Sequence, residues 1–296
     1  MAVDSLSNSA SSVGGLNKIL RPLGVILAYA VIIIFALAMI MPFVYAVANS
    51  FKAPSDIANN PQLLLADPET GYPATGYQRV FAQDFPRWTM NSLIYAAFVT
   101  IGNIIFCSMA GYALARISFP GRSIAFAALV GTMMVPGIVM LIPRFLILKQ
   151  IGLVDTYGGL ILPMMAGAFG VFLMKQFFAS IPADIEEAAS IDGASRIRMF
   201  FTVIMPIAIP ALTALAIFSF QGAWNDFTGP LIAVGSSKEL WTLPLGLAFI
   251  RGNTGQALEW DILLAGAVIT TLPMAIIFFV FQRFFMESAT YTGVKG

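Results

Sequence analysis

The chain has no histidine, a single cysteine and few charged residues. Of its 296 residues, 16 are Lys or Arg and 15 are Asp or Glu, so only 10% of the chain is charged. Without histidine, the commonest general base and the commonest metal ligand are both missing. Cys107 lies inside an apolar run, which excludes a disulfide or a thiolate metal site within one chain. A net charge of +1 gives no electrostatic footprint for nucleic acid.

The sequence also lacks a phosphate-binding loop. No G-x-x-x-x-G-K-[ST] pattern occurs, because no lysine has the required glycines upstream. We therefore expect no cofactor in this chain. If ATP powers the protein, we expect partner subunits to bind the ATP and its Mg²⁺.

Apolar residues are abundant instead. They make up 58% of the chain, and the mean hydropathy is +0.84. Soluble domains average about 25% charged and about 45–50% apolar residues. A single soluble core of this length cannot hide so much apolar surface. The composition therefore predicts an all-α integral membrane protein rather than a soluble enzyme.

Crossing a bilayer takes about 20 mostly apolar residues in a helix. Six stretches qualify, and each is bounded by charge or by turn residues. The predicted spans are 22–50, 88–115, 123–143, 157–174, 206–234 and 262–282. Prolines interrupt the third and fifth spans, which favours a transporter over a passive anchor. In the fifth span the expected interruptions are Asp226 and Pro230.

The first apolar run has a competing interpretation as a cleaved signal peptide. Ala46-Val47-Ala48 has the small-x-small pattern of a cleavage site, but the run is far longer than the 7–15 residues of a cleavable segment. We therefore expect an uncleaved first helix. Residues 1–17, rich in Ser, Asn and Gly, are predicted to form a flexible tail.

The distribution of Lys and Arg predicts the orientation. Nine of the 16 basic residues fall on one side if the N-terminus is cytoplasmic. We expect a multi-pass inner-membrane protein with both termini in the cytoplasm. The predicted division is a cytoplasmic tail at 1–21, a six-helix membrane domain at 22–290 and a second cytoplasmic tail at 291–296. Residues 51–87 and 235–261 would then lie outside, and the polar segment 176–205 inside.

The inner segment 176–205 carries the most informative pattern. Pro182 suits a first helical turn, and the acids that follow it favour the positive end of that helix. Gly193 can end the helix in a left-handed conformation, and Ser195 can cap the next helix, predicted at 196–204. One alternative is an interfacial elbow that only links two spans. An acidic helix would be repelled by anionic lipid, however, which favours docking on a protein.

The run Glu187-Ala188-Ala189, followed by Gly193 and then by Val203-Ile204-Met205-Pro206, resembles the EAA loop of ABC importer permeases. The family pattern is E-A-A-x-x-x-G, nine residues, then I-x-L-P; Val203 and Met205 depart from it conservatively. Further similarity lies at 142–143, 152–156, 177–178, 181–182, 224–227 and 293–296. From about residue 20 to its end, the chain is similar to MalG-type, MetI-like permease subunits of carbohydrate ABC importers.

This resemblance implies a partner set and a coupling site. The chain would form the sugar path with a second, MalF-like permease, and would work with two copies of an ABC ATPase and an extracytoplasmic sugar-binding protein. The loop would be the coupling helix that docks on the ATPase, with Glu187 pairing with a basic residue and Gly193 permitting the bend. The implied coupling residues are Glu187, Ala188, Ala189, Asp192, Gly193 and Pro206.

The resemblance also implies roles for the C-terminal tail and for the outer loop between the fifth and sixth predicted spans. The tail Gly293-Val294-Lys295-Gly296 would reach the ATPase dimer interface, although a frayed terminus is the alternative. The outer loop would probe the binding protein's sugar pocket, although it would otherwise be a solvated turn. The residues proposed for that loop are Arg251, Gly252, Asn253, Thr254, Gly255 and Gln256.

Asp226 is the one acid inside a predicted span, near its outer boundary. Acids within spans are functional candidates, and Trp224, Asn225 and Asp226 suit a sugar path or an outer gate. The alternative is a plain interfacial acid. In the maltose system of this family, the sugar contacts within the membrane lie on the partner permease.

Three other functions compete with a sugar permease. Within the same family, the substrate could be a polyol or glycerol phosphate. An ion-coupled secondary transporter would need several carboxylates within the membrane, and the predicted spans contain only Asp226. An intramembrane enzyme would need histidines or an acid pair. We therefore expect a transport subunit that is not itself an enzyme.

Overall fold

The computed structural model describes the backbone of residues 4–252 and 259–291 and the side chains of residues 24–250 and 259–282. All regular elements in these ranges are helices, and they contain no strand. The chain divides into two compact units. The first comprises residues 1–77 and 260–268, and the second comprises residues 78–259 and 269–296.

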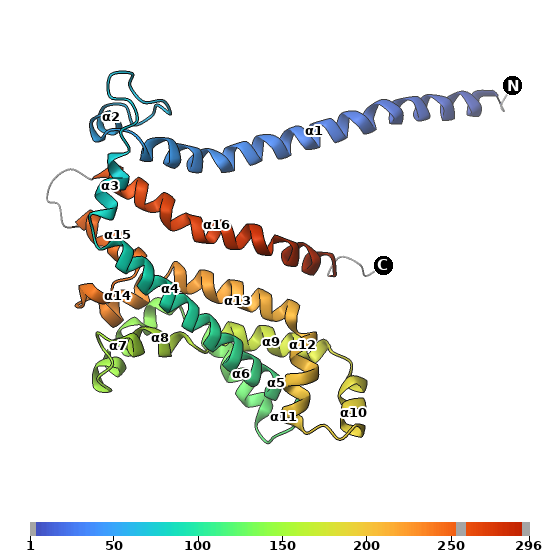
Figure 1. The fold of residues 1–296 in the computed structure, drawn as a ribbon. Coiled ribbons are helices and arrows are strands. Elements are labelled where there is room, and N and C mark those ends of the chain that lie inside the picture. Colours follow the sequence, from blue (N-terminus) through green and yellow to red (C-terminus); the bar gives the residue numbers. More distant parts are fainter. Residues whose placement is uncertain (1–3, 253–258, 292–296) are drawn as a thin grey trace. The chain divides into compact units, whose positions relative to one another are not determined.

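The first unit is built on one long helix, labelled α1 in Figure 1. Its elements are α1 (Asp4–Ser50), α2 (Pro54–Asn59), the start of α3 (Thr75–Phe81) and the first turns of α16 (Trp260–Tyr291). The predicted flexible tail at 1–17 is wrong from Asp4 onward, because the helix already begins there. Once the long apolar run has nucleated a helix, adding further residues to its end is inexpensive.

The second unit contains the remaining helices. They are α4 (Phe85–Gly102), η1 (Asn103–Cys107), α5 (Ser108–Arg116), α6 (Arg122–Met133), η2 (Gly137–Met140), α7 (Leu141–Gln150), α8 (Tyr157–Ile161), η3 (Leu162–Met164), α9 (Ala168–Ser180), α10 (Ala183–Ile191), α11 (Arg196–Met199), η4 (Phe200–Ile204), α12 (Met205–Ile207), α13 (Ile209–Trp224), α14 (Thr228–Val234), η5 (Lys238–Leu240) and α15 (Leu243–Gly252). The elements η1 and η4 are π-helical, and the other three η elements are 3₁₀ helices.

Four helical stretches among the described residues are long and apolar enough to cross a membrane. They are Gly24–Ser50, Phe85–Arg116, Tyr157–Ser180 and Trp260–Gln282. Two further pairs are sharply bent: Arg122–Met133 with Gly137–Gln150, at 98°, and Arg196–Ile207 with Ile209–Trp224, at 80°. The described chain therefore has four candidate spans, or up to six if each bent pair counts as one. It is a multi-pass membrane protein.

The third and fifth predicted spans are not continuous helices. The third breaks at Pro136, whose extended backbone (φ −58°, ψ 130°) separates α6 from η2. The fifth bends at Ala208, and α13 starts again at Ile209-Pro210, where proline is tolerated in a first turn. Helix α13 ends at Trp224 and α14 is a separate helix, which confirms the predicted interruption at Asp226. Pro230 lies inside α14 and does not interrupt it, contrary to the prediction.

The core of the second unit holds together the end of the bundle near α10. Helix α5 packs along α9, and α4 along α13. The rings of Tyr112, Phe178 and Phe200, from α5, α9 and η4, meet at centroid distances of 5.0–6.3 Å. Asn103 links the π-helical turn to the segment before α9, because its amide donates to Met164 and its oxygen accepts the N–H of Gly167. Such polar links fasten helices where apolar lipid provides little driving force.

Candidate functional site

Helix α10 is a short acidic helix that follows directly on α9. It runs from Ala183 to Ile191, with Asp184 and Glu186 in its first turn, where acids oppose the positive end of the helix dipole. Pro182 stands one residue before the predicted position, at the N-cap, with extended backbone (φ −56°, ψ 138°). The predicted helix between the fourth and fifth spans is confirmed.

The end of α10 also follows the sequence prediction. Gly193 has φ +78°, a left-handed conformation that side chains rarely adopt, and the N–H of Ala194 reaches back to the carbonyl of Ala189 at 3.0 Å. Ser195 then caps α11, its hydroxyl accepting the N–H of Arg198 at 3.3 Å. The bend presents α10 and α11 as two connected helices, labelled near the lower right of Figure 1.

One acid of α10 is held against the bundle. The Glu186 carboxylate lies 3.2 Å from Nε of Arg116, at the end of α5, with both side chains largely buried. Arg116 also donates to the carbonyl of Ile181. On the same side of α10, Ile185 and Ala189 pack against the core. Arg116 and Ile181 therefore fasten α10 to the spans on either side of it.

The predicted coupling residues lie mostly on the other side. Glu187, Ala188, Asp192 and Gly193 are exposed, whereas Ala189 is half-buried against the core. Pro206 is also exposed, but it lies in α12, outside the α10–α11 segment of the sequence. The exposed carboxylate, small side chain and bend provide a surface on which another protein could pack.

Sequence reasoning missed two apolar residues beside this bend. Ile191 is 86% exposed and Ile197 is 74% exposed, on either side of Gly193. Isolated exposed apolar residues are ordinary, but these two flank the polar residues of the predicted docking surface. Their position within an otherwise polar segment was the available signal. Arg116 was missed as well, because only the fold brings it to Glu186, 70 positions further along the chain.

A second cluster surrounds Asp226, in the break between α13 and α14. Its carboxylate accepts the Tyr95 hydroxyl at 2.9 Å and the N–H of Gly229 at 3.0 Å. Arg144 lies close by, with Nη1 donating to the sulfur of Met164, while its Nε and Nη2 find no hydrogen-bond partner among the described residues. Asp226 thus lies beyond the end of α13. It was predicted from the sequence to lie inside a span.

The residues beside Asp226 differ in exposure. Trp224 is 1% exposed, stacks on Phe220, and donates its indole N–H to the carbonyl of Thr270 at 3.1 Å. Trp224 is therefore a packing residue in this structure, whereas Asn225 is exposed and Asp226 is half-buried.

The two remaining predicted sites fall largely outside the described residues. Arg251 and Gly252 form the end of helix α15, where a loop was expected. Residues 253–256 of the predicted binding-protein loop lie outside the described residues, as does the predicted tail at 293–296.

The fold defines a multi-pass α-helical membrane protein. Residues 108–289 match the family described as "Binding-protein-dependent transport system inner membrane component". The chain belongs to this family, and the matched residues include all of α10 and its bend.

Curated relatives and a solved structure agree with this assignment. The chain is 33% identical over 263 residues to "Arabinooligosaccharides transport system permease protein AraQ" of Halalkalibacterium halodurans, covering 88% of this chain and 93% of the relative. It is 33% identical over 271 residues to "Trehalose/maltose transport system permease protein MalG" of Thermococcus litoralis, covering 89% and 94%. A bacterial ABC transporter structure, described as involved in the import of the acidic polysaccharide alginate, matches with a TM-score of 0.79. It is 24% identical, covers 90% of this chain and 97% of that chain, and shows the shared fold alone.

Proposed function

We propose that this chain is the membrane-spanning permease subunit of an ATP-driven, binding-protein-dependent importer of saccharides. The observation that carries the proposal is the family match over residues 108–289, together with similarity across nearly the whole chain to saccharide permeases. The chain would form the sugar path with a second permease. Two ATPase subunits would supply ATP hydrolysis, and an extracytoplasmic binding protein would deliver the sugar.

The proposed coupling site is the exposed side of α10. Glu187 and Ala188 face away from the bundle, and Asp192-Gly193 turns the chain toward α11. A groove of the ATPase with a basic residue would fit this surface, with Glu187 as the charge partner and Ile191 and Ile197 as apolar contacts. If both termini are cytoplasmic, as we propose, α10 would lie on the same side of the membrane as the ATPase.

Because α10 is attached to the helical bundle, it is suited to transmitting motion of a bound ATPase to the membrane spans. The Arg116–Glu186 ion pair ties α10 to α5, and Ile185 and Ala189 tie it to the core formed by α5, α9 and η4. A displacement of α10 would therefore move several spans together instead of bending a free loop. In this proposal, ATP-driven closure of the ATPases would be converted into alternating access for the sugar.

Two experiments test the proposal. Tagged chain purified from native membranes in mild detergent should bring down a second permease and an ATPase. A Glu187→Arg, Gly193→Pro double variant should keep the permease and lose the ATPase, whereas Glu69→Arg, at an exposed acid far along the sequence, should keep both. A chain that purifies alone and moves solute under an ion gradient would overturn the proposal and favour a secondary transporter.

Uptake by cells that lack and then regain this chain tests the substrate class. Arabinotriose, maltose, trehalose, diacetylchitobiose and glycerol 3-phosphate would be compared as labelled substrates. Chain-dependent uptake of a saccharide supports the proposal. Uptake of glycerol 3-phosphate alone would move the assignment to glycerol phosphate.

A further inference from the structure

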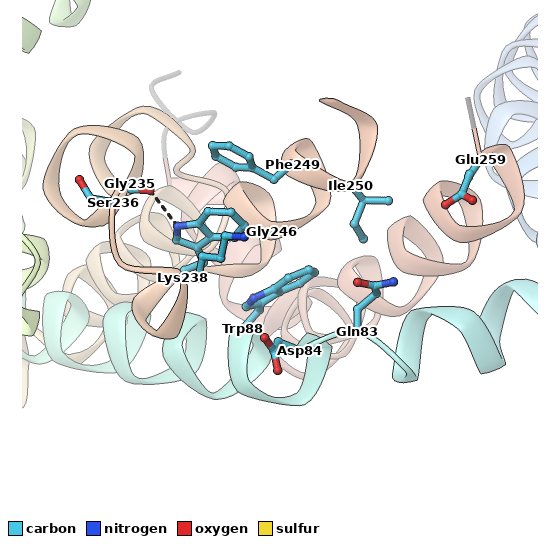
Figure 2. Close-up of a pocket in the computed structure, with 11 residues that line it drawn as sticks. Gln83, Asp84, Trp88, Gly235, Ser236, Lys238, Gly246, Phe249, Ile250 and Glu259 are labelled. Carbon is cyan, nitrogen blue, oxygen red and sulfur yellow. Dashed lines mark hydrogen bonds between the residues drawn. The ribbon is translucent and has the colours of Figure 1, made fainter. Parts of the chain in front are cut away.

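A cavity of about 460 Å³ lies at the start of α4, within the second unit of the chain. Figure 2 shows Gln83, Asp84 and Trp88 on one side of it and Phe249 and Ile250, from α15, on the other. Its volume lies within the range of small-molecule sites, about 300–1,000 Å³.

Aromatic rings form much of the wall. Trp241 stacks on Phe249, with ring centroids 4.2 Å apart and planes 21° from parallel, and it lies 6.4 Å from Trp88. The Trp241 indole is fixed by donating to the carbonyl of Gly235 at 3.1 Å. A side chain at Gly246 would collide with the Trp88 ring, since a Cβ there would lie 2.3 Å from it. The rings are therefore held in place before any ligand arrives.

Polar groups of both charges surround these rings. Gln83 and Asp84 are exposed at the cavity, and Lys238 lies 5.9 Å from the Trp241 ring centroid. Glu259 also lines the cavity and forms an ion pair with Arg79. Together these groups include amide, carboxylate and ammonium groups, which can donate to and accept from neutral hydroxyls.

One buried donor in the wall is unpaired. The indole nitrogen of Trp88 is buried, and it has no hydrogen-bond partner among the described residues. Buried tryptophan N–H groups usually find a partner. The neighbouring Trp241 shows the ordinary arrangement, because its N–H does donate to a carbonyl.

We propose that this cavity binds one end of a saccharide, with an apolar sugar face against the Phe249–Trp241 pair and hydroxyls on Gln83, Asp84 and Lys238. This inference rests on the proposed function and adds a sugar contact on this chain. The combination of fixed aromatic faces with polar groups of both signs favours a polyhydroxylated ring. A purely apolar ligand would leave the polar rim unused, and a simple anion would meet Asp84 and Glu259.

The test is direct binding to the assembled complex in nanodiscs, without the binding protein. The ligand is whichever saccharide of the uptake panel the complex transports fastest, and affinity is measured by titration calorimetry. Phe249→Ala and Asp84→Asn should each weaken binding about 3–30-fold, the loss expected for one aromatic contact or one charged hydrogen bond. The matched controls are Phe119→Ala, an equally exposed phenylalanine between α5 and α6, and Glu69→Gln; both should bind as wild type.

The possible outcomes distinguish a saccharide site from a protein-docking site and from failure of the proposed function. Binding weakened in the cavity variants and kept in the controls supports the proposal. A transported saccharide that binds equally well to all variants overturns it while leaving the proposed function intact. Variants that keep saccharide affinity but lose capture of the binding protein would make the cavity a protein-docking site instead. If none of the panel is transported, the proposed function fails, and this inference fails with it.

Discussion

The ion pair between Arg116 and Glu186 predicts how firmly α10 is held. We consider Glu186→Gln, which keeps the shape of the side chain and removes its charge. At 3.2 Å and an effective dielectric constant of about 20, two unit charges attract by about 5 kcal/mol before desolvation. Exposed pairs retain about 0.2–1 kcal/mol of such attraction, while breaking a fully buried pair costs about 3–5 kcal/mol.

The Arg116–Glu186 pair lies between these limits. Its two side chains are 16% and 19% exposed, and the facing Nε and Oε1 atoms form no hydrogen bond with each other. We therefore expect Glu186→Gln to lower the free energy of detaching α10 by about 1–2 kcal/mol, within those bounds. That change corresponds to an increase of about 5–30-fold in the detached population.

Hydrogen exchange of the α10 amides, followed by mass spectrometry, measures this population directly. In Glu186→Gln, residues 183–191 should exchange about 5–30-fold faster, while α13 stays unchanged. Arg116→Gln should have a larger effect, because the hydrogen bond to the Ile181 carbonyl is lost as well. The matched control is Glu187→Gln, one residue along the same helix and exposed, which should leave exchange as in wild type.

The same variants separate anchoring from docking. Glu187→Gln should weaken ATPase capture without loosening α10. Glu186→Gln should loosen α10 and reduce the sugar transported per ATP while the ATPase stays bound. Equal exchange in Glu186→Gln and wild type would refute the reasoning, since the ion pair would then contribute nothing to holding α10.

Three further variants test other parts of the structure. Gly193→Val should destabilise the α10–α11 bend by about 1–2 kcal/mol, the strain of a left-handed backbone on a side chain, seen as faster exchange at 192–196; unchanged exchange would contradict it. Tyr95→Phe removes the hydroxyl that Asp226 accepts and should lower the thermal midpoint by a few degrees, whereas Tyr72→Phe should have a smaller effect because Tyr72 is exposed. Asn103→Leu leaves the N–H of Gly167 without its acceptor and should cost about 1–3 kcal/mol in chemical denaturation; a neutral result would show that water replaces the amide.

Much of the helical content follows from composition and local chemistry. The second and sixth spans were predicted nearly to the residue, because long apolar runs bounded by charge have few other solutions in a membrane. Gly193 and Ser195 were also predictable, since a left-handed end and a helix cap depend on residues within one turn. These features require no knowledge of where other helices lie.

The breaks were harder to place, because several prolines compete for each one. Pro206 sits inside a helix without breaking it, whereas the bend falls at Ala208, two residues before Pro210. An apolar count cannot tell these outcomes apart, and so the fifth span was drawn too long. Asp226 was then assigned to a span, although it lies in the turn after α13 and accepts the N–H of Gly229.

On α10, the direction in which each acid points can be predicted from the local sequence, whereas the partner of each acid cannot. Successive residues of a helix point about 100° apart. Ile185 and Ala189 pack on the core, and four positions separate their directions by only about 40°. Relative to the middle of that buried pair, Glu186 points about 80° away and Glu187 about 180° away. A basic residue beside the helix can therefore reach Glu186 from the bundle, whereas Glu187 is the acid aimed most directly outward. The rotation of α10 is thus readable from two apolar positions, but the partner that holds Glu186 is not, because Arg116 belongs to another span.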